Sequence, residues 1–289
     1  MVEIRPATTG DIPAIVAFTT DTFDWGDYIP EVLPRWIDDD EGILLVAVED
    51  ERPIGIARGE LLSPTEAWFH AARVHPDHRG RGVAVTLAHR LFAWARAEGA
   101  EVGRLLVEDW NEPSIRNVTK LGMRPAARFH RAVRAVGEAS VRTEGNGGRI
   151  VPARIRLAPS AEAQPAFTSW SGGVLGRVSR MLYECRPWTF RRLRPDDLAD
   201  AAKREHFWEV GSGWALVTPA DDALEVGWLE TTPDEATAFL GATAALAAER
   251  RRDEVVWWLP DVDWLVDAAR RLGAEIRRLT VYTIGLEPR

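Results

Sequence analysis

Hydrophobic and polar positions along the first half of the chain predict an alternating order of strands and helices. Apolar residues at every second position are typical of strands, and apolar residues every three or four positions are typical of helices. The clearest helix lies at 83–99, where an apolar stripe ends before a glycine. The expected strands lie at the start of 2–11 and at 42–50, 52–62, 66–76, 102–110 and 124–136, and the other expected helices lie at 12–23 and 111–122.

The second half of the chain repeats this order after a polar, glycine-rich stretch at 136–150. We expect a domain boundary in that stretch, because its composition is typical of a linker. The expected domains are residues 1–138 and 154–289, joined by a linker at 139–153. In the second half the expected strands lie at 213–219, 224–233, 255–260 and 278–286, the expected helices at 234–251 and 261–275, and a strand followed by a helix at 188–205.

The spacing of the two halves suggests a duplication. Pro76 and Gly122 are 46 positions apart, and the corresponding Pro233 and Gly273 are 40 apart. The positions that the second half lacks fall at the connection between a strand and a helix. In the first half this connection is an arginine- and glycine-rich loop, and in the second half it is only TTPDEA. A duplicated unit whose second copy lost this loop accounts for the pattern. A chance similarity between two mixed α/β folds is the alternative.

The stretch HPDHRGRGVA, at 75–84, carries the clearest chemical signal in the chain. A helix start offers about four backbone N–H groups without an internal partner and roughly half a positive charge. Gly80 and Gly82 let the backbone come close to a phosphate, and Arg79 and Arg81 add charge and hydrogen-bond donors. The stretch therefore predicts a pyrophosphate-binding loop, with a solvated basic turn as the alternative.

This loop resembles that of the GNAT superfamily of acyl-CoA-dependent N-acyltransferases, whose pattern is Arg/Gln-x-x-Gly-x-Gly/Ala. RGRGVA matches the pattern with Arg79, Gly82 and Ala84, and the segments ARVHP, RLLVEDW and NEPSIRNVTKLGM are also typical of the family. The resemblance covers residues 2–135 well and 187–286 more weakly. It implies a mixed α/β fold in two tandem copies, each a largely antiparallel sheet flanked by helices, with an active first copy and a degenerate second one.

The resemblance also implies where acetyl-CoA binds, namely in a V between the strands 66–74 and 102–110. Its pyrophosphate would meet the loop amides, and backbone groups around Val74 would pair with the pantetheine and the thioester oxygen. The residues expected to contact this cofactor are Val74, His75, Arg79, Gly80, Arg81, Gly82, Val83, Ala84, Asn111, Ser114 and Asn117. Asn111 has a second expected role, as the cap of the helix that follows it.

N-acylation needs a neutral amine, so a general base is expected beside the thioester. Strand alternation puts Trp68, His70 and Val74 on one face, and a histidine, with an ordinary pKa of about 6.5, suits proton removal. In serotonin N-acetyltransferases, a histidine at the matching distance before the loop acts in this way. Glu60 and Glu66 are the rivals, a structural role for His70 is the alternative, and the Val74 N–H is the expected oxyanion donor.

One position departs from the family pattern. The tyrosine that usually meets the departing thiolate lies four residues before the glycine of the second motif, and this position is Val118 here. Ser114, Asn117 or a water molecule would protonate the thiolate, or the thiolate would leave without a proton donor from the protein. The departure motivates a rival reading from another class, a non-catalytic acyl-CoA-binding sensor module.

The segment 23–37 lies where the family places its substrate-binding helices. Asp27 and Tyr28, together with Trp68, are the expected substrate contacts, because a carboxylate and aromatic rings suit a cationic or zwitterionic amine. The pattern GDYIP...PRWI, which includes Trp36, is similar to histidine N-acetyltransferases and points to the α-amino group of a free amino acid. A protein N-terminus or a lysine side chain is the alternative acceptor.

Composition narrows the partners further. The net charge of -8 argues against a general nucleic-acid binder, and the single cysteine, Cys185, excludes an internal disulfide and a cysteine-based zinc site. No apolar signal segment and no run of about 18 apolar residues is present. We therefore expect a cytoplasmic monomer or homodimer that uses acetyl-CoA, acetylates a small-molecule amine and needs no metal, membrane or nucleic acid.

Overall fold

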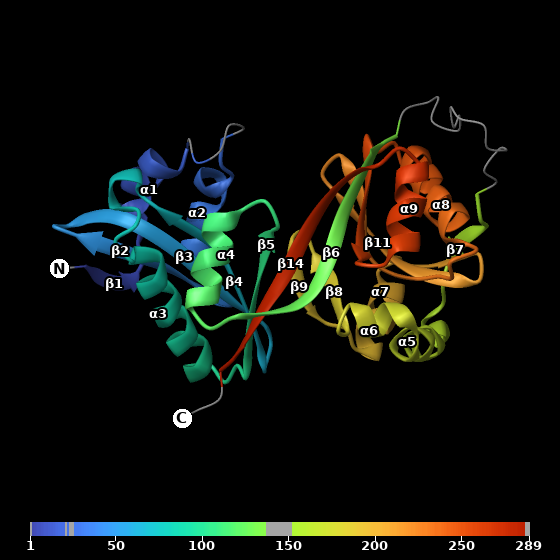
Figure 1. Ribbon diagram of the computed structural model, residues 1–289, viewed down its shortest axis with the longest axis horizontal. Coiled ribbons are helices and arrows are strands. Elements are labelled where there is room, and N and C mark those ends of the chain that lie inside the picture. The colour runs from blue at the N-terminus through green and yellow to red at the C-terminus, as the bar shows by residue number, and fades with distance from the viewer. Residues whose placement is uncertain (1, 21, 23–25, 137–151, 287–289) are drawn as a thin grey trace. The chain divides into compact units, whose positions relative to one another are not determined.

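The computed structural model describes residues 2–20, 22, 26–136 and 152–286, and the chain divides into two compact units (Figure 1). Unit 1 comprises 1–107, 111–124 and 282–289, and unit 2 comprises 108–110 and 125–281. Unit 1 therefore contains segments from both ends of the chain, and unit 2 consists of segments between them. In the part of the chain that is described, no helix has the length and apolar character needed to cross a membrane.

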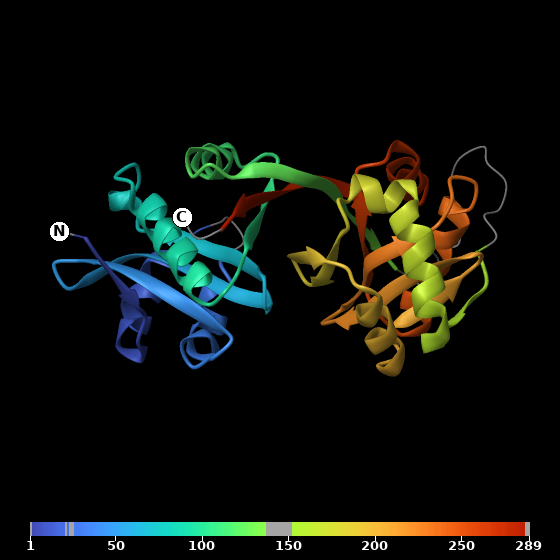
Figure 2. The ribbon, with the colours of Figure 1, turned by 90° about the horizontal axis from the view of Figure 1, so that it is seen from below.

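Unit 1 is a sheet with helices on both faces, in the strand order β1-β2-β3-β4-β5-β14. In Figure 2, α3 lies on one side of this sheet and α1 and α2 lie on the other. Alternate residues of β2 accordingly enter two cores, Leu45 beside α3 and Leu44 beside α1 and α2. The elements are β1 (Glu3–Pro6), α1 (Ile12–Thr19), α2 (Ile29–Ile37), β2 (Gly42–Glu49), β3 (Arg52–Ser63), β4 (Glu66–Val74), α3 (Val83–Ala97), β5 (Val102–Glu108) and α4 (Glu112–Lys120).

The parallel strands β4 and β5 pair only near their starts. Over their described lengths the register joins 66–68 to 102–104, although β4 continues to Val74 and β5 to Glu108. The other neighbours from β1 to β4 are antiparallel and pair along most of their length. Beyond Trp68, the edge of β4 that faces β5 is therefore open, which is the V-shaped separation expected from the sequence.

Unit 2 contains the remaining strands of the same 12-stranded sheet, in the order β14-β6-β13-β12-β11-β10-β7. Its strands β12 and β13 are again parallel, and the helix α8 connects them. A hairpin of β8 and β9 forms a separate two-stranded sheet. The elements are β6 (Arg124–Ala135), β7 (Ile155–Leu157), α5 (Ala163–Gly172), α6 (Val174–Val178), β8 (Leu182–Arg186), β9 (Thr189–Arg192), α7 (Pro195–Lys203), β10 (Phe207–Val210), β11 (Gly213–Ala220), β12 (Ala223–Glu230), α8 (Ala236–Glu249), β13 (Glu254–Pro260), α9 (Asp263–Arg271) and β14 (Glu275–Gly285).

The two units exchange their last strands. β6 follows the elements of unit 1 in the sequence, yet it pairs with β13 in unit 2. The end of β14 returns to unit 1, where the Leu286 N–H donates to the Glu101 carbonyl at 2.7 Å, and where Tyr282 and Leu286 are buried in the core. These units differ from the expected domains 1–138 and 154–289. The sequence did not indicate this difference, because an exchange of strands between the units leaves the order of elements along the chain unchanged.

Two local expectations also need correction, and a third falls mostly outside the described residues. The helix expected at 12–23 ends at Thr19, and a separate helix, α2, follows it. The strand and helix expected at 188–205 are β9 and α7, but β9 pairs with β8, and the outer strand of the unit 2 sheet is β7. Most of the expected linker, from 139 to 151, lies outside the described residues.

The exchanged segment should be essential for the stability of unit 1. Leu286 is 1% exposed in the unit 1 core, so Leu286→Ala should lower the free energy of unfolding by about 2–5 kcal/mol. Urea unfolding of the full chain measures this change. Leu157, which is 41% exposed on β7, is the matched control, and Leu157→Ala should change stability by less than about 0.5 kcal/mol. Equal effects of the two substitutions would contradict the exchange.

Candidate active site

A bulge in β4 determines how the candidate side chains point. Arg73 lies opposite Ile56 and His70 lies opposite Arg58, so one residue of β3 faces two residues, Ala71 and Ala72. Ala71 has a φ of 57°, a left-handed conformation that costs a residue with a side chain about 1–2 kcal/mol. The bulge therefore stores strain in the middle of the candidate site.

The bulge reverses the alternation of β4 beyond His70. The His70 ring meets Trp36 of α2, whereas the Val74 side chain packs with the core beside α3. Arg73, not Val74, shares the face of His70, since its register partner Ile56 lies in the core beside α1 and α2. The expectation that His70 and Val74 share a face is wrong, because it assumed an unbroken strand.

The backbone of Val74 nevertheless faces the gap between β4 and β5. The His75 N–H donates to the Ile54 carbonyl at 2.9 Å, so the neighbouring pair of Val74 and Gly55 shares no mutual hydrogen bond. The Val74 N–H and carbonyl therefore point away from β3. The Arg79 Nε donates to this carbonyl at 3.3 Å, which fixes the strand end to the loop that follows.

The loop before α3 presents a row of backbone N–H groups. Gly80 and Gly82 have φ values of 76° and 83°, and no heavy atom lies within 4 Å of a Cβ built on either residue. Val83 begins α3 and buries its side chain in the core. In the described structure, no residue accepts a hydrogen bond from the N–H groups of 80–85. Such a row at the positive end of a helix is suited to an anion.

The two loop arginines have partners within the protein. Arg79 donates to Val74, and the Arg81 Nη2 lies 2.8 Å from the Glu49 Oε1. The His78 Nε2 lies 3.3 Å from the other oxygen of Glu49. Hydrogen bonding from Arg81 lowers the pKa of Glu49, so this carboxylate is charged at neutral pH and offsets part of the positive charge of the loop.

The three base candidates differ in their contacts. The His70 Nε2 lies 3.6 Å from the Glu60 Oε1, and the His70 and Glu60 side chains are 24% and 10% exposed. Glu66 forms an ion pair with Arg104 of β5, where the two strands still pair. His70 and Glu60 therefore form an acid–base pair at the site, whereas the Glu66 charge is compensated within the sheet.

An aromatic edge borders His70. The Trp36 ring lies 5.1 Å from the His70 ring and 6.0 Å from the Tyr28 ring, edge-on in both cases. The Arg58 guanidinium lies 5.0 Å from the centre of the Trp36 ring. Tyr28 is 38% exposed, whereas Trp68, which was expected to contact a substrate, is 2% exposed. Tyr28 is thus better placed than Trp68 to contact an acceptor, and Trp36, which is 8% exposed, packs edge-on between Tyr28 and His70.

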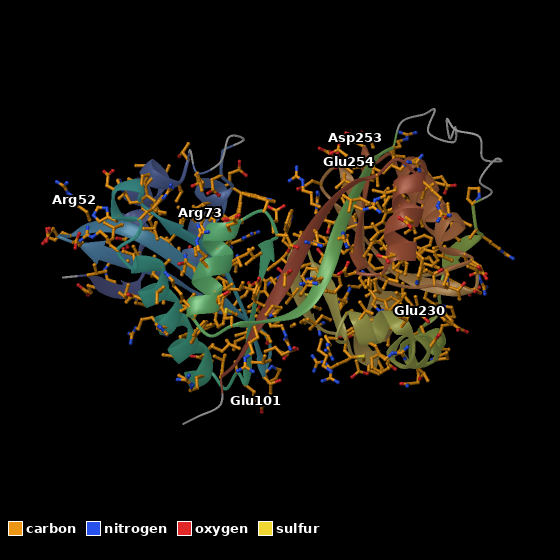
Figure 3. The ribbon with its side chains drawn as sticks, in the orientation of Figure 1. Arg52, Arg73, Glu101, Glu230, Asp253 and Glu254 are labelled. Carbon is orange, nitrogen blue, oxygen red and sulfur yellow. The ribbon has the colours of Figure 1, made fainter. Side chains whose placement is uncertain are left out.

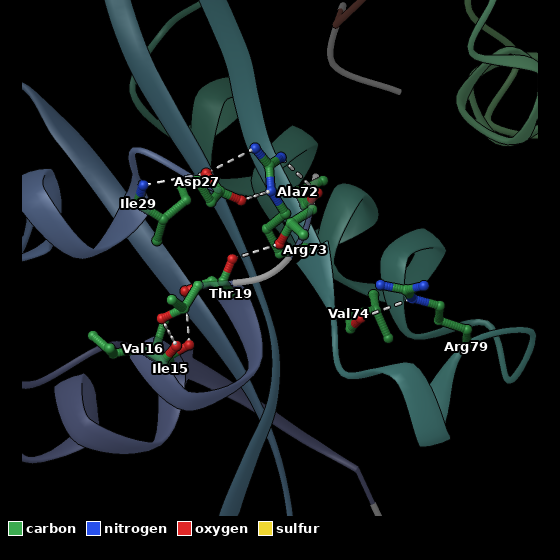
Figure 4. A network of polar contacts seen from close by, with 11 residues as sticks. Ile15, Val16, Thr19, Asp27, Ile29, Ala72, Arg73, Val74 and Arg79 are labelled. Atoms are coloured by element: carbon green, nitrogen blue, oxygen red, sulfur yellow. Dashed lines mark hydrogen bonds and ion pairs between the residues drawn. The ribbon is translucent and has the colours of Figure 1, made fainter. Parts of the chain in front are cut away.

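Asp27 holds the start of α2 against the end of β4 (Figure 4). Its side chain is fully buried, and its Oδ2 lies 2.6 Å from the Nε of Arg73, the residue labelled on β4 in Figure 3. The Asp27 Oδ1 also accepts a hydrogen bond from the Ile29 N–H at 3.2 Å. The Asp27 carboxylate is therefore committed to Arg73 and positions the aromatic edge, and it does not face a substrate as expected.

The remaining expected contacts lie at the end of β4 and on α4. His75 is half-exposed directly after β4. The Asn111 side chain accepts a hydrogen bond from the Ser114 N–H at 3.2 Å, so it caps α4 as expected. Ser114 and Asn117 are half-buried on this helix. Val118, at the position of the missing tyrosine, is buried in the core beside α3.

Comparison with protein families decides the class of this unit. A model described as the acetyltransferase (GNAT) family matches residues 13–123, a range that contains β4, the loop and α4. The chain carries a GNAT acetyltransferase domain. The domain makes the protein an acyltransferase.

Solved structures share the fold of this chain over almost its whole length. A GCN5-related N-acetyltransferase from Sphaerobacter thermophilus has a TM-score of 0.68 at 14% identity, covering 99% of this chain and 96% of that one. A protein from Thermoplasma acidophilum has a TM-score of 0.62 at 17% identity, covering 98% and 99%. A GCN5-related N-acetyltransferase from Kribbella flavida has a TM-score of 0.52 at 17% identity, covering 99% and 72%. A comparison with curated proteins gives no significant match.

Sequence reasoning missed three charged residues of the GNAT site: Glu49, Arg58 and Arg73. Their partners lie 32, 19 and 46 positions away along the chain, in Arg81, Asp39 and Asp27. No local pattern marks such pairs, since only folding brings the charges together.

The buried pair of Asp27 and Arg73 should matter far more for stability than the exposed pair of Glu49 and Arg81. Asp27→Ala leaves the guanidinium of Arg73 without its partner, and it should lower the free energy of unfolding by about 3–5 kcal/mol. Glu49→Ala, which also removes one carboxylate, should cost at most about 1 kcal/mol because Arg81 is half exposed. Urea unfolding compares the two variants, and a larger loss for Glu49→Ala would contradict the assignment.

Proposed function

We propose that the protein transfers an acetyl group from acetyl-CoA to the primary amine of a small molecule, by direct attack of the amine in a ternary complex. The observation that carries the proposal is the row of N–H groups at 80–85, for which no residue in the described parts of the chain supplies an acceptor. Gly80 and Gly82 leave the space in front of this row free. Pyrophosphate oxygens are suited to such a row.

Acetyl-CoA supplies an acetyl group activated as a thioester. In the proposed arrangement the amides at 80–85 hold its pyrophosphate, and Arg81 contributes only part of its charge because it is bound to Glu49. The Val74 N–H, which faces the gap beyond the last pair of β4 and β5, would donate to the thioester oxygen. One such donor is typically worth about 3 kcal/mol in the transition state.

We assign His70 as the general base and Glu60 as its positioning residue. A primary amine is largely protonated at neutral pH and must lose a proton before it attacks. An imidazole nitrogen of His70 takes this proton, and the Glu60 Oε1, 3.6 Å from the His70 Nε2, stabilises the charge that results. Glu66 is less suited to the role because Arg104 neutralises it.

The proposed acceptor is the α-amino group of a free amino acid. Tyr28 and Trp36 give the acceptor side an aromatic edge next to His70, suited to packing a small side chain. Glu60 borders the same edge and offers a carboxylate to the amino group, whereas Arg58 is fully buried and paired with Asp39. Asp27 adds no free negative charge, because it is paired with Arg73.

Substitution of a loop glycine should separate binding from stability. Gly82→Ala places a side chain at φ 83° and in front of the amides, so it should weaken acetyl-CoA binding at least about tenfold in calorimetry. Gly273→Ala is the matched control, since Gly273 has φ 79° and equally open surroundings in unit 2. Both variants should lose similar stability, and a similar loss of binding in both would contradict the loop site.

Removal of His70 should change the pH profile of turnover. With His70→Ala, the rate should fall about a hundredfold at pH 7 and recover as the pH approaches the pKa of the amine, because the neutral amine then forms without a base. Release of the coenzyme A thiol, measured over amino acids, polyamines and a peptide N-terminus, gives the rate and the acceptor. His89→Ala, on the exposed surface of α3, is the control. Tight binding of acetyl-CoA without turnover on any acceptor would instead support a sensor.

A further inference from the structure

Unit 2 contains a cavity of about 140 Å³ that the chemistry proposed for unit 1 does not use. Its walls come from the hairpin β8–β9, from α7 and from the strands β11 and β12. A cavity of about 150 Å³ can hold a molecule the size of benzene. The cavity can therefore accept a ligand of roughly that size.

According to the strand registers, this cavity occupies the position in unit 2 that corresponds to the acceptor side of unit 1. The parallel pairs begin at Glu66 in β4 and at Ala223 in β12, so His70 and Gly227 are both four residues further along. Across the sheet, Glu60 lies opposite Trp68, and Thr218 lies opposite Glu225, so Glu60 and Thr218 also correspond. Thr218 and Gly227 both line the cavity.

The hairpin encloses this position in unit 2. A Cβ built on Gly227 would lie 2.3 Å from the carbonyl oxygen of Glu184 in β8, so only glycine allows the hairpin to approach β12 this closely. The corresponding position in unit 2 thus has no histidine side chain, and the Glu184 Oε2 lies 2.6 Å from the site of the Cβ built on Gly227. The connection from β12 to α8 also lacks the glycines of the phosphate loop and carries Asp234 and Glu235. A ligand in this cavity would therefore bind without reacting.

The charges around the cavity balance one another. Arg191 and Asp197 form a double hydrogen bond, with distances of 2.6 and 3.0 Å, and Arg204 and Asp200 lie at the more exposed side. Asp200 also forms an ion pair with Lys203 at 2.7 Å, but both side chains are exposed, and such surface pairs contribute little. Burial raises the pKa of the Glu184 carboxyl group and raises that of the Cys185 thiol to about 12, and it lowers the pKa of His206, so each of these lining groups favours its neutral form. Two positive and two negative side chains around a small space suit a zwitterion.

We propose that the cavity of unit 2 binds a free amino acid as a non-reacting ligand, with Arg204 contacting its carboxylate and Asp200 its amino group. Thr218 supplies a hydroxyl at the position that corresponds to Glu60. The assignment depends on the cavity and its charges, and it stands whether or not acetyl-CoA binds to unit 1.

Calorimetry of the full chain with each of the common amino acids, in the absence of acetyl-CoA, tests the proposal. At least one amino acid should bind, Arg204→Ala should weaken it about tenfold or more, and Thr218→Phe should abolish binding by filling the cavity. Arg154→Ala, another exposed arginine of unit 2, and His70→Ala should leave the affinity unchanged.

Two results would overturn the assignment. One is the absence of any amino-acid binding to the folded wild-type chain. The other is binding that His70→Ala removes while Arg204→Ala does not, which would place the ligand in unit 1. Because Arg204 is exposed, its variant keeps the test valid even if Thr218→Phe fails to fold.

Discussion

The early end of hydrogen bonding between β4 and β5 is the constraint on which the candidate site depends. Two parallel strands that paired along their full length would satisfy each other's backbone groups and leave nothing for a ligand. Here the pairing stops at Trp68, and the Val74 N–H and carbonyl face the gap. The amides at 80–85 continue this set of open donors into the start of α3.

The bulge at Ala71 and the ion pair of Asp27 with Arg73 shape the same strand beside the proposed base. The bulge turns Arg73 to the face of His70, and Asp27 then fastens the start of α2 to it. As a result Tyr28 and Trp36 lie beside the His70 and Glu60 pair. Strain at one residue thus decides which side chains surround the proposed base.

The two units share one arrangement of strands but differ at the position of the proposed base. In each unit a series of antiparallel strands leads to a pair of parallel strands that a helix connects. The last strand of each unit comes from the other half of the sequence. Unit 1 keeps the glycine loop and the histidine, whereas unit 2 has a hairpin over Gly227 in place of the base. The exchange of β6 and β14 makes each sheet depend on the whole chain, because a missing last strand would expose β5 or β13.

The sequence alone determined the order of most strands and helices, and it supplied the candidate phosphate loop and the candidate base His70. These features depend on residues close together in the chain, such as the apolar stripe of α3 and the cap at Asn111. Only the tertiary structure decided which strand belongs to which sheet, the bulge at Ala71 and the pairing of Arg73 with Asp27. The physical reason is that these features arise from contacts between distant segments, for which alternation and spacing carry no signal.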